Sequence, residues 1–250
     1  MKKLNTFFAG IAMVAGVVLG GAAHAETLKV GSTPTGVPFT FLDTKSDKIT
    51  GLMVDIMNEV GKEAGYDVTT VPLAWSALIP SLTTGKIDAV SAAMFVTPER
   101  QKVVDFTDTV YQYGEGLIVP KSDGKNYVSF ADLKGKVVGA QIGTPFLKAL
   151  QDSGLFAEVK VYETLQDLLR DINTGRLDAG VADYPILAYQ VSHGGFTNTR
   201  LLTSYKAVMP GQVGIAVQKG HPDRVAKLNA AIAKVKADGR IDAIVKKWGL

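Results

Sequence analysis

Two residues of opposite charge follow two nearly identical segments of this chain, and they are the strongest candidates for binding chemistry. Residues 84–90 read TGKIDAV and residues 174–180 read TGRLDAG; Arg100 comes after the first segment and Asp183 after the second. The planar guanidinium of an arginine grips a carboxylate through two charge-assisted hydrogen bonds. Burial of an unpaired carboxylate or ammonium costs several kcal/mol, so a site for a free amino acid needs a partner for each charge. The pair therefore indicates two similar lobes that close on a zwitterion.

A third candidate joins this pair, and both members of the pair also fit plainer roles. Thr144 stands at the start of an expected helix, where backbone N–H groups would point at the same carboxylate. Arg100 also fits the solvated surface of a helix. Asp183 also fits a helix N-cap before Tyr184 and Pro185. The sequence leaves these alternatives open.

Alternating strands and helices predict the scaffold that positions these residues. In the first half, apolar spacing predicts strands at 28–31, 68–71 and 87–92, with helices at 52–64 and 77–82 between them. The second half repeats the pattern, with strands at 136–139 and 159–162 and a capped helix at 165–172. A strand-helix-strand-helix-strand order requires parallel pairing. We therefore expect an α/β protein with two mostly parallel sheets, each flanked by helices.

Two apolar segments, 116–120 and 214–217, are expected to cross between the lobes. The first lobe is then discontinuous and comprises residues 26–118 and 207–250. The second lobe comprises residues 119–206. The chain is long enough to bury two modest cores, although its length alone does not establish two lobes.

The first 25 residues have the pattern of a cleavable secretory signal. Lys2 and Lys3 precede an apolar run at 7–19, and Ala-His-Ala at 23–25 forms a small-x-small cleavage site. A membrane anchor is the alternative, but glycines interrupt the run and it is short for a membrane span. Because two lysines and no acids leave with the signal, the net charge falls from +3 to +1. A nearly neutral protein is a poor partner for nucleic acid.

The chain contains no cysteine, which excludes disulfides, thiolate metal sites, cysteine nucleophiles and a lipidated N-terminal cysteine. An exported chain without an anchor indicates the periplasm of a Gram-negative bacterium. His193 and His221 lie in loop-like contexts and indicate no metal site. We expect no metal and no cofactor, and we expect a monomer.

Six short motifs, spread over essentially the whole expected mature chain, resemble the polar amino acid family of periplasmic solute-binding proteins, family 3. They are ALIPSL at 77–82, GKIDA at 85–89, TPER at 97–100, DFTD at 105–108, GRLDA at 175–179 and KVKADG at 234–239. The resemblance implies the type II Venus-flytrap fold, in which two hinge strands join two α/β lobes, and delivery of a solute to the membrane permease of an ABC transporter. It also implies that Arg100 holds the ligand carboxylate, that Asp183 holds its α-amino group and that the ring of Trp75 packs on the ligand.

The sequence departs from this family pattern in the first lobe. The strand before the arginine commonly carries serine or threonine, but here it holds Ala92, Ala93 and Phe95, and the aromatic residue near the first turn is displaced to Phe39. With Trp75 these rings suggest an aromatic cage, because a ring face attracts a desolvated cation by about 2 kcal/mol. A compatible solute such as ectoine or a betaine is thus the alternative ligand. The plainer interpretation is that Phe95 and Phe39 fill the core and that the pocket holds a common amino acid.

Three further residues, Tyr184, Tyr113 and Glu115, are expected near the cleft or hinge, with Glu115 as an exposed charge rather than a partner for a basic ligand. A distant alternative function is an enzyme of the cyclohexadienyl dehydratase type, which shares this architecture. Such an enzyme needs a general acid or base in the cleft, and no histidine stands in a suitable position. The sequence therefore predicts a binding protein and not an enzyme.

Overall fold

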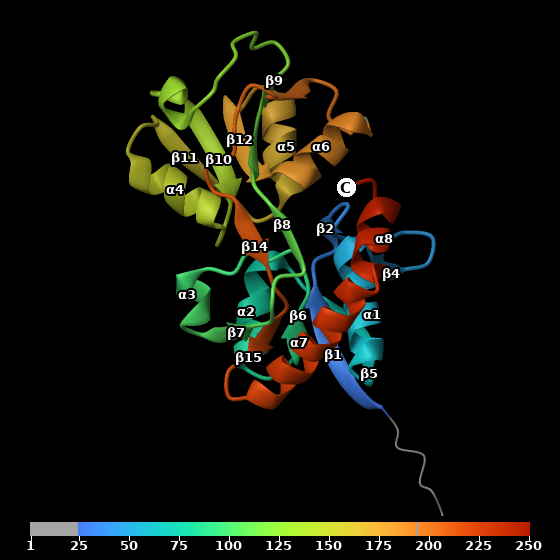
Figure 1. The fold of residues 1–250 in the computed structure, drawn as a ribbon. Helices are drawn as coiled ribbons and strands as arrows, with labels where there is room; N and C mark the ends of the chain where they lie inside the picture. The colour runs from blue at the N-terminus through green and yellow to red at the C-terminus, as the bar shows by residue number, and fades with distance from the viewer. Residues whose placement is uncertain (1–24, 194) are drawn as a thin grey trace, which may run out of the picture.

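The computed structural model describes residues 25–193 and 195–250, which form two lobes (Figure 1). The expected signal segment, residues 1–25, lies outside the described residues except for Ala25. Among the described residues, no helix has both the length and the apolar character that a membrane span requires.

The first lobe is built on a five-stranded sheet. Its strands stand in the order β5 (Tyr66–Pro72), β1 (Glu26–Ser32), β6 (Ala89–Val90), β15 (Ala216–Gln218) and β7 (Val104–Phe106). β1 pairs in parallel with β5 and β6, as the order of elements along the chain predicts. β15 returns from the C-terminal part of the chain and pairs antiparallel with β6 and β7, so the first lobe is discontinuous in sequence.

The helices of this lobe are α1 (Leu52–Glu63), α2 (Leu78–Thr83), α3 (Pro98–Gln101), α7 (Pro222–Ala237) and α8 (Arg240–Lys247), with a 3-10 turn η1 (Trp75–Ala77) before α2. Leu52, Ile56 and Val60 repeat at helical spacing and are fully buried, which confirms the face predicted for α1. The C-terminal helices α7 and α8 pack beside α1 (Figure 1). A small three-stranded sheet of β2 (Thr35–Gly36), β3 (Thr40–Asp43) and β4 (Lys48–Thr50) follows β1. Its strands are too short for a pattern in the sequence to reveal them.

The second lobe carries a five-stranded sheet of its own. The order is β11 (Glu158–Tyr162), β10 (Val137–Gln141), β12 (Ala179–Asp183), β9 (Glu115–Pro120) and β13 (Thr199–Leu201). β10 pairs in parallel with β11 and β12, and β9 runs antiparallel between β12 and β13. The flanking helices are α4 (Pro145–Ser153), α5 (Leu165–Asn173), α6 (Tyr184–Ser192) and the 3-10 turn η2 (Phe130–Leu133).

Two short antiparallel strands, β8 (Tyr111–Tyr113) and β14 (Gly211–Val213), run between the lobes (Figure 1). The crossovers expected at 116–120 and 214–217 are therefore misplaced. The first segment is β9 of the second sheet, and the second leads into β15 of the first sheet. The expected boundary after residue 118 falls inside β9. An apolar run marks a buried strand, and β8, which reads Tyr-Gln-Tyr, is too short and too mixed to be recognised as the connection.

Candidate ligand-binding site

A narrow cavity lies between the lobes, where the parallel strands of both sheets end. This edge is where open α/β sheets bind ligands. The first lobe lines the cavity with Thr33, Thr35, Gly36, Phe39, Thr40, Trp75, Ala92 and Ala93, and the second lobe with Gln141, Leu165, Asp183 and Ile186. The cavity volume is about 20 Å³, little more than one water molecule needs. The lobes are therefore closed on each other.

Direct hydrogen bonds hold the lobes in this closed arrangement. Ser76 Oγ donates to Glu163 Oε1 at 2.6 Å, and Gln166 Nε2 donates to the Thr35 carbonyl oxygen at 2.6 Å. Gln166 and the cavity residue Leu165 are the first two residues of α5 apart from its cap. The start of α5 therefore lies against both the cavity and the opposite lobe.

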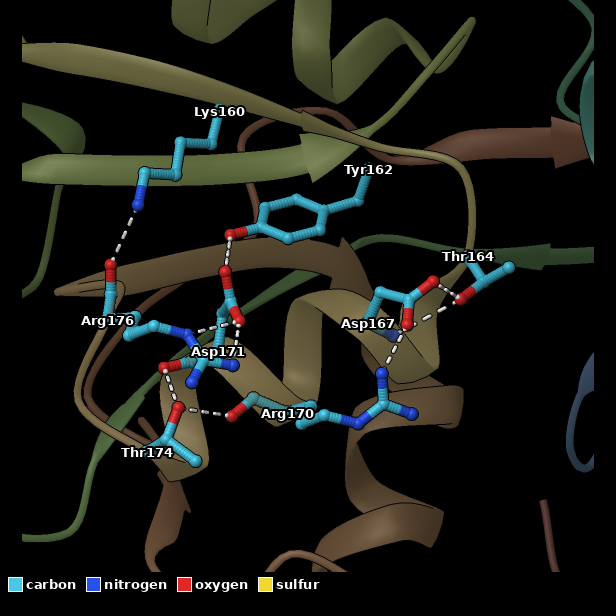
Figure 2. Close-up of polar contacts among 8 residues, drawn as sticks. All are labelled: Lys160, Tyr162, Thr164, Asp167, Arg170, Asp171, Thr174 and Arg176. Carbon is cyan, nitrogen blue, oxygen red and sulfur yellow. Dashed lines mark hydrogen bonds and ion pairs between the residues drawn. The ribbon is translucent and has the colours of Figure 1, made fainter.

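Polar contacts at both ends fix the position of α5 (Figure 2). Thr164 caps its start and accepts from the Asp167 backbone N–H at 3.2 Å. Near its end, Asp171 accepts from the Tyr162 hydroxyl at 2.8 Å and from Arg176 Nε at 2.9 Å. This confirms the cap that the sequence predicts at Thr164, and it ties α5 to the edge strand β11.

Asp183 is the acidic residue of the cavity, at the junction of β12 and α6. It occupies the N-cap position of α6, but its side chain makes no capping hydrogen bond. The plainer role of Asp183 as a helix cap is thus wrong; Asp183 lines the cavity, with its carboxylate beside the Tyr113 hydroxyl. Burial raises the pKa of Asp183 to about 6, although the neighbouring Tyr113 and Arg100 act in the opposite direction.

Arg100 lies beside this cavity rather than on its wall. Thr97 caps α3 and accepts from the Arg100 backbone N–H at 3.3 Å. Its side chain is buried, so the alternative of a solvated helix residue is wrong. Nη1 donates to the Phe95 carbonyl oxygen at 2.7 Å, and Nη2 crosses between the lobes to the Gly143 carbonyl oxygen at 3.0 Å.

The ring of Trp75 lies beside Arg100 and also lines the narrow cavity. The guanidinium carbon lies 5.5 Å from the centre of the ring, within range of a cation–π interaction. Trp75 lines the narrow cavity and also a second cavity of about 250 Å³, to which Arg100 and Gly143 belong. Burial lowers the pKa of Arg100, while Tyr113 and Asp183 act to raise it. Arg100 and Asp183 are therefore close enough to interact electrostatically.

Three predicted site residues, Thr144, Tyr184 and Phe95, do not line either cavity. Thr144 accepts from the Leu147 backbone N–H at 3.2 Å and donates to the Gln141 carbonyl oxygen at 2.7 Å, so its hydroxyl serves the start of α4. Tyr184 is 45 % exposed and holds the hinge through its backbone N–H, which donates to the Gly114 carbonyl oxygen at 3.0 Å. The sequence shows where α4 begins, but not that the Thr144 hydroxyl is used by its own helix. It also does not show on which side of α6 the Tyr184 ring lies.

The aromatic cage is only partly assembled. Phe95 is buried, with its ring centre 4.5 Å from that of Tyr113 and 5.7 Å from that of Phe146 in the second lobe, and it lines neither cavity. A methyl group on Gly211 would overlap the Phe95 ring. Phe95 is therefore a core residue of the hinge, as the plainer interpretation has it. Phe39 is also buried, but it lines the narrow cavity together with Trp75.

Ala93 lines the cavity in a strained backbone conformation. Its φ angle is +54°, in the left-handed region that residues with a Cβ rarely adopt. Its carbonyl oxygen accepts a 2.8 Å hydrogen bond from the Tyr113 hydroxyl. Tyr113 thus connects the strained turn to the hinge strand β8, next to both Arg100 and Asp183.

Uncharged polar residues of the cavity are missing from the sequence-based candidates. The hydroxyls of Thr33 and Thr40 lie 2.7 Å apart in a mutual hydrogen bond. The Gln141 amide Nε2 donates to the Glu163 carbonyl oxygen at 2.8 Å, which leaves the amide oxygen as an acceptor. Thr33 and Gln141 stand where β1 and β10 end, so the carboxyl edge of each predicted strand is the signal that would have identified them.

Glu115 differs most from its expected role. It is 1 % exposed and accepts three hydrogen bonds, from the Tyr205 hydroxyl at 2.7 Å, the Val208 N–H at 2.7 Å and the Met209 N–H at 3.0 Å. Glu115 therefore fixes the segment that returns from the second lobe to the hinge strand β14. Among the described residues, no group of histidine and carboxylate side chains forms a metal site.

The chain matches the family model described as bacterial extracellular solute-binding proteins, family 3, over residues 28–250. It is 33 % identical over 233 residues to the ABC transporter arginine-binding protein 1 of Escherichia coli (strain K12), an alignment that covers 91 % of this chain and 93 % of the relative.

The chain is also similar to solved structures of amino acid-binding proteins. An ancestral arginine-binding protein bound to glutamine superposes with a TM-score of 0.81 at 32 % identity, and the match covers 89 % of this chain and 97 % of the other. The ancestral amino acid-binding protein AncCDT-1, a precursor of cyclohexadienyl dehydratase, has a TM-score of 0.79 at 31 % identity, with coverage of 89 % and 94 %.

Proposed function

Because this chain belongs to the bacterial extracellular solute-binding proteins of family 3, we propose that it captures a free amino acid between its lobes and presents it to an ABC transporter. The observation that carries the proposal is Asp183. It lines the cavity between the lobes, and its carboxylate makes no helix cap and has a pKa of about 6. An α-ammonium group is the natural counter-ion for such a group, because it supplies both the missing charge and hydrogen-bond donors.

Arg100 is the partner of the ligand carboxylate in this proposal. Both of its terminal nitrogens donate to backbone carbonyl oxygens, and one of these, on Gly143, belongs to the opposite lobe. A carboxylate accepts hydrogen bonds more strongly than a neutral carbonyl does. The ligand therefore competes for Arg100 when the lobes are apart and the Gly143 contact is open.

Binding then proceeds by closure of one lobe on the other. The lobes divide at β8 and β14, the two strands that connect the sheets. The ligand contacts Trp75 and Arg100 of the first lobe, and Asp183 of the second lobe completes the site. A ligand favours the closed form only through contacts that both lobes make with it.

The same proposal places the chain in the periplasm after removal of residues 1–25, as a monomer that docks on a membrane permease. It is a binding protein and not an enzyme. Turnover of a cyclohexadienyl acid by the purified protein would contradict this, and the similarity to AncCDT-1 makes that substrate the one to test.

Thermal melting with each of the common amino acids tests the proposal directly. A ligand that binds the native state at 100 times its Kd stabilises the protein by about 2.7 kcal/mol. We expect a raised melting temperature with at least one amino acid, loss of that shift in Asp183→Asn, and its retention in Tyr184→Phe, which alters an exposed neighbour. The absence of any shift with wild-type protein, confirmed by calorimetry, would overturn the proposed function.

A further inference from the structure

The walls of the cavity between the lobes carry one ionisable side chain among the described residues. That side chain is Asp183. The other polar walls are Thr33, Thr35, Thr40 and Gln141, and the remaining walls are glycine, alanine or larger apolar residues. A ligand in this cavity therefore meets one negative charge on its walls, and the positive charge of Arg100 lies 5.5 Å from the centre of the Trp75 ring.

Three other acids, in or beside the strands and helices that line the cavity, already have hydrogen-bond partners. Glu163 accepts from the Ser76 hydroxyl at 2.6 Å, and its side chain lies at the surface. The Asp167 carboxylate of α5 pairs with Arg170 at 2.5 Å and accepts from the Thr164 hydroxyl at 2.7 Å. Buried Glu115 is surrounded by three donors in the hinge. None of these three carboxylates belongs to the cavity wall, so none stands there as a counter-ion for a basic side chain.

From this charge balance we infer that the ligand is an amino acid whose side chain is uncharged, an inference that rests on the proposed function. Asp183 and Arg100 neutralise the ammonium and carboxylate groups that every amino acid carries. A third charge on the ligand would be buried without a partner when the lobes close, which is strongly unfavourable. Arginine, lysine and glutamate are therefore excluded by the same cavity that accepts neutral residues.

The neutral polar walls give the site its selectivity. In the mutual hydrogen bond of Thr33 and Thr40, one hydroxyl proton is used and the other remains available to a ligand. The Gln141 amide oxygen is available as an acceptor, because its amide nitrogen already donates to Glu163. These groups can hydrogen-bond to a neutral donor or acceptor on the ligand side chain, but they supply no counter-ion for a charged side chain.

Calorimetry with ligands of matched size and different charge tests the inference. Glutamine is compared with glutamate, and methionine and glutamine are compared with lysine and arginine. We expect the best neutral amino acid to bind at least 100-fold more tightly than every charged one. Tightest binding of a basic or acidic amino acid would overturn the inference and leave the proposed function standing. Failure of all amino acids to bind would overturn both.

A charge installed in the cavity gives a second test. We expect Thr33→Asp to improve the ratio of lysine or arginine binding to neutral amino acid binding at least 10-fold, because it supplies the missing counter-ion. Thr33→Asn controls for shape, and Thr44→Asp controls for net charge, since Thr44 is exposed in a turn. Thr44→Asp should keep the wild-type affinities, whereas Thr33→Asn alters the cavity wall and lowers affinity without adding a charge, so its ratio of basic to neutral ligand binding should not rise. Melting temperatures report the folding of each variant. An unchanged ratio in folded Thr33→Asp would count against the inference.

Discussion

The Arg100 guanidinium donates a 3.0 Å hydrogen bond to the Gly143 carbonyl oxygen, across the gap between the lobes. The other terminal nitrogen of Arg100 donates to Phe95 within its own lobe. The two bonds differ in consequence, because only the bond to Gly143 must break when the lobes separate. In the proposed function, Arg100 therefore links closure of the lobes to the availability of its charge for a ligand carboxylate.

Arg100→Ala should weaken amino acid binding at least 100-fold, because a bidentate charged contact contributes about 3 to 6 kcal/mol. The fold should persist, with a modest loss of stability from the unpaired Phe95 carbonyl oxygen. Arg100→Lys keeps the charge but not the planar fork, so its affinity should lie between that of the wild type and that of Arg100→Ala. Calorimetry measures the affinities and circular dichroism reports folding. Near-native affinity in Arg100→Ala would remove Arg100 from the site.

Binding should depend on pH through Asp183. Its pKa is raised by burial from 3.8 to about 6, and the ligand ammonium requires the ionised form. Proton competition therefore weakens binding about 10-fold at pH 5 relative to pH 7. Asp183→Asn should bind weakly at both pH values and lose this dependence. A wild-type affinity that is equal at pH 5 and pH 7 would show that Asp183 does not hold the ligand.

The stability of the free protein should change with pH in the opposite sense. A raised pKa in the folded state means that the folded protein binds the proton more tightly than the unfolded chain does. The Asp183 contribution is therefore most unfavourable above pH 6 and is relieved as the pH falls toward 3.8. Subtracting the pH profile of the free energy of unfolding of Asp183→Asn from that of the wild type isolates this contribution. A wild type that gains stability relative to the variant as the pH rises from 4 to 7 would contradict it.

The sequence reveals the charged pair and the two sheets, but not the interior of the site. Arg100 and Asp183 each come after one copy of a repeated segment, so their types and positions are sufficient to select them as candidates. Thr33, Thr40 and Gln141 are neutral residues of common types, and only the folded edge of each sheet brings them together. The sequence allows the Phe95 ring to lie either in the cavity or in the core, because its location depends on packing against Gly211 of the distant strand β14. Local patterns do not encode such contacts.

The contact between Phe95 and Gly211 should appear as strong coupling between mutations. Phe95→Ala should destabilise the protein by about 3 to 5 kcal/mol, because it opens a cavity in the hinge core. Gly211→Ala should destabilise by about 1 to 3 kcal/mol, because its methyl group overlaps the ring. In the double variant the methyl group has room, so the two effects should fall short of additivity by at least about 1 kcal/mol in urea unfolding. Additive effects would show that the ring does not pack on Gly211.

Ala93→Gly should retain or raise stability, although glycine usually weakens a structured position. Ala93 has φ +54°, and this left-handed conformation destabilises a residue with a Cβ by about 1 to 2 kcal/mol but does not destabilise glycine. Glycine loses about 0.5 to 1 kcal/mol through its greater freedom in the unfolded chain, so the net change should lie between zero and about 1.5 kcal/mol of stabilisation. Ala93→Val is the matched comparison and should destabilise strongly, because a branched side chain fits neither the φ angle nor the cavity wall. Urea unfolding of both variants measures the two effects, and a loss of more than about 1 kcal/mol in Ala93→Gly would show that this turn is not strained.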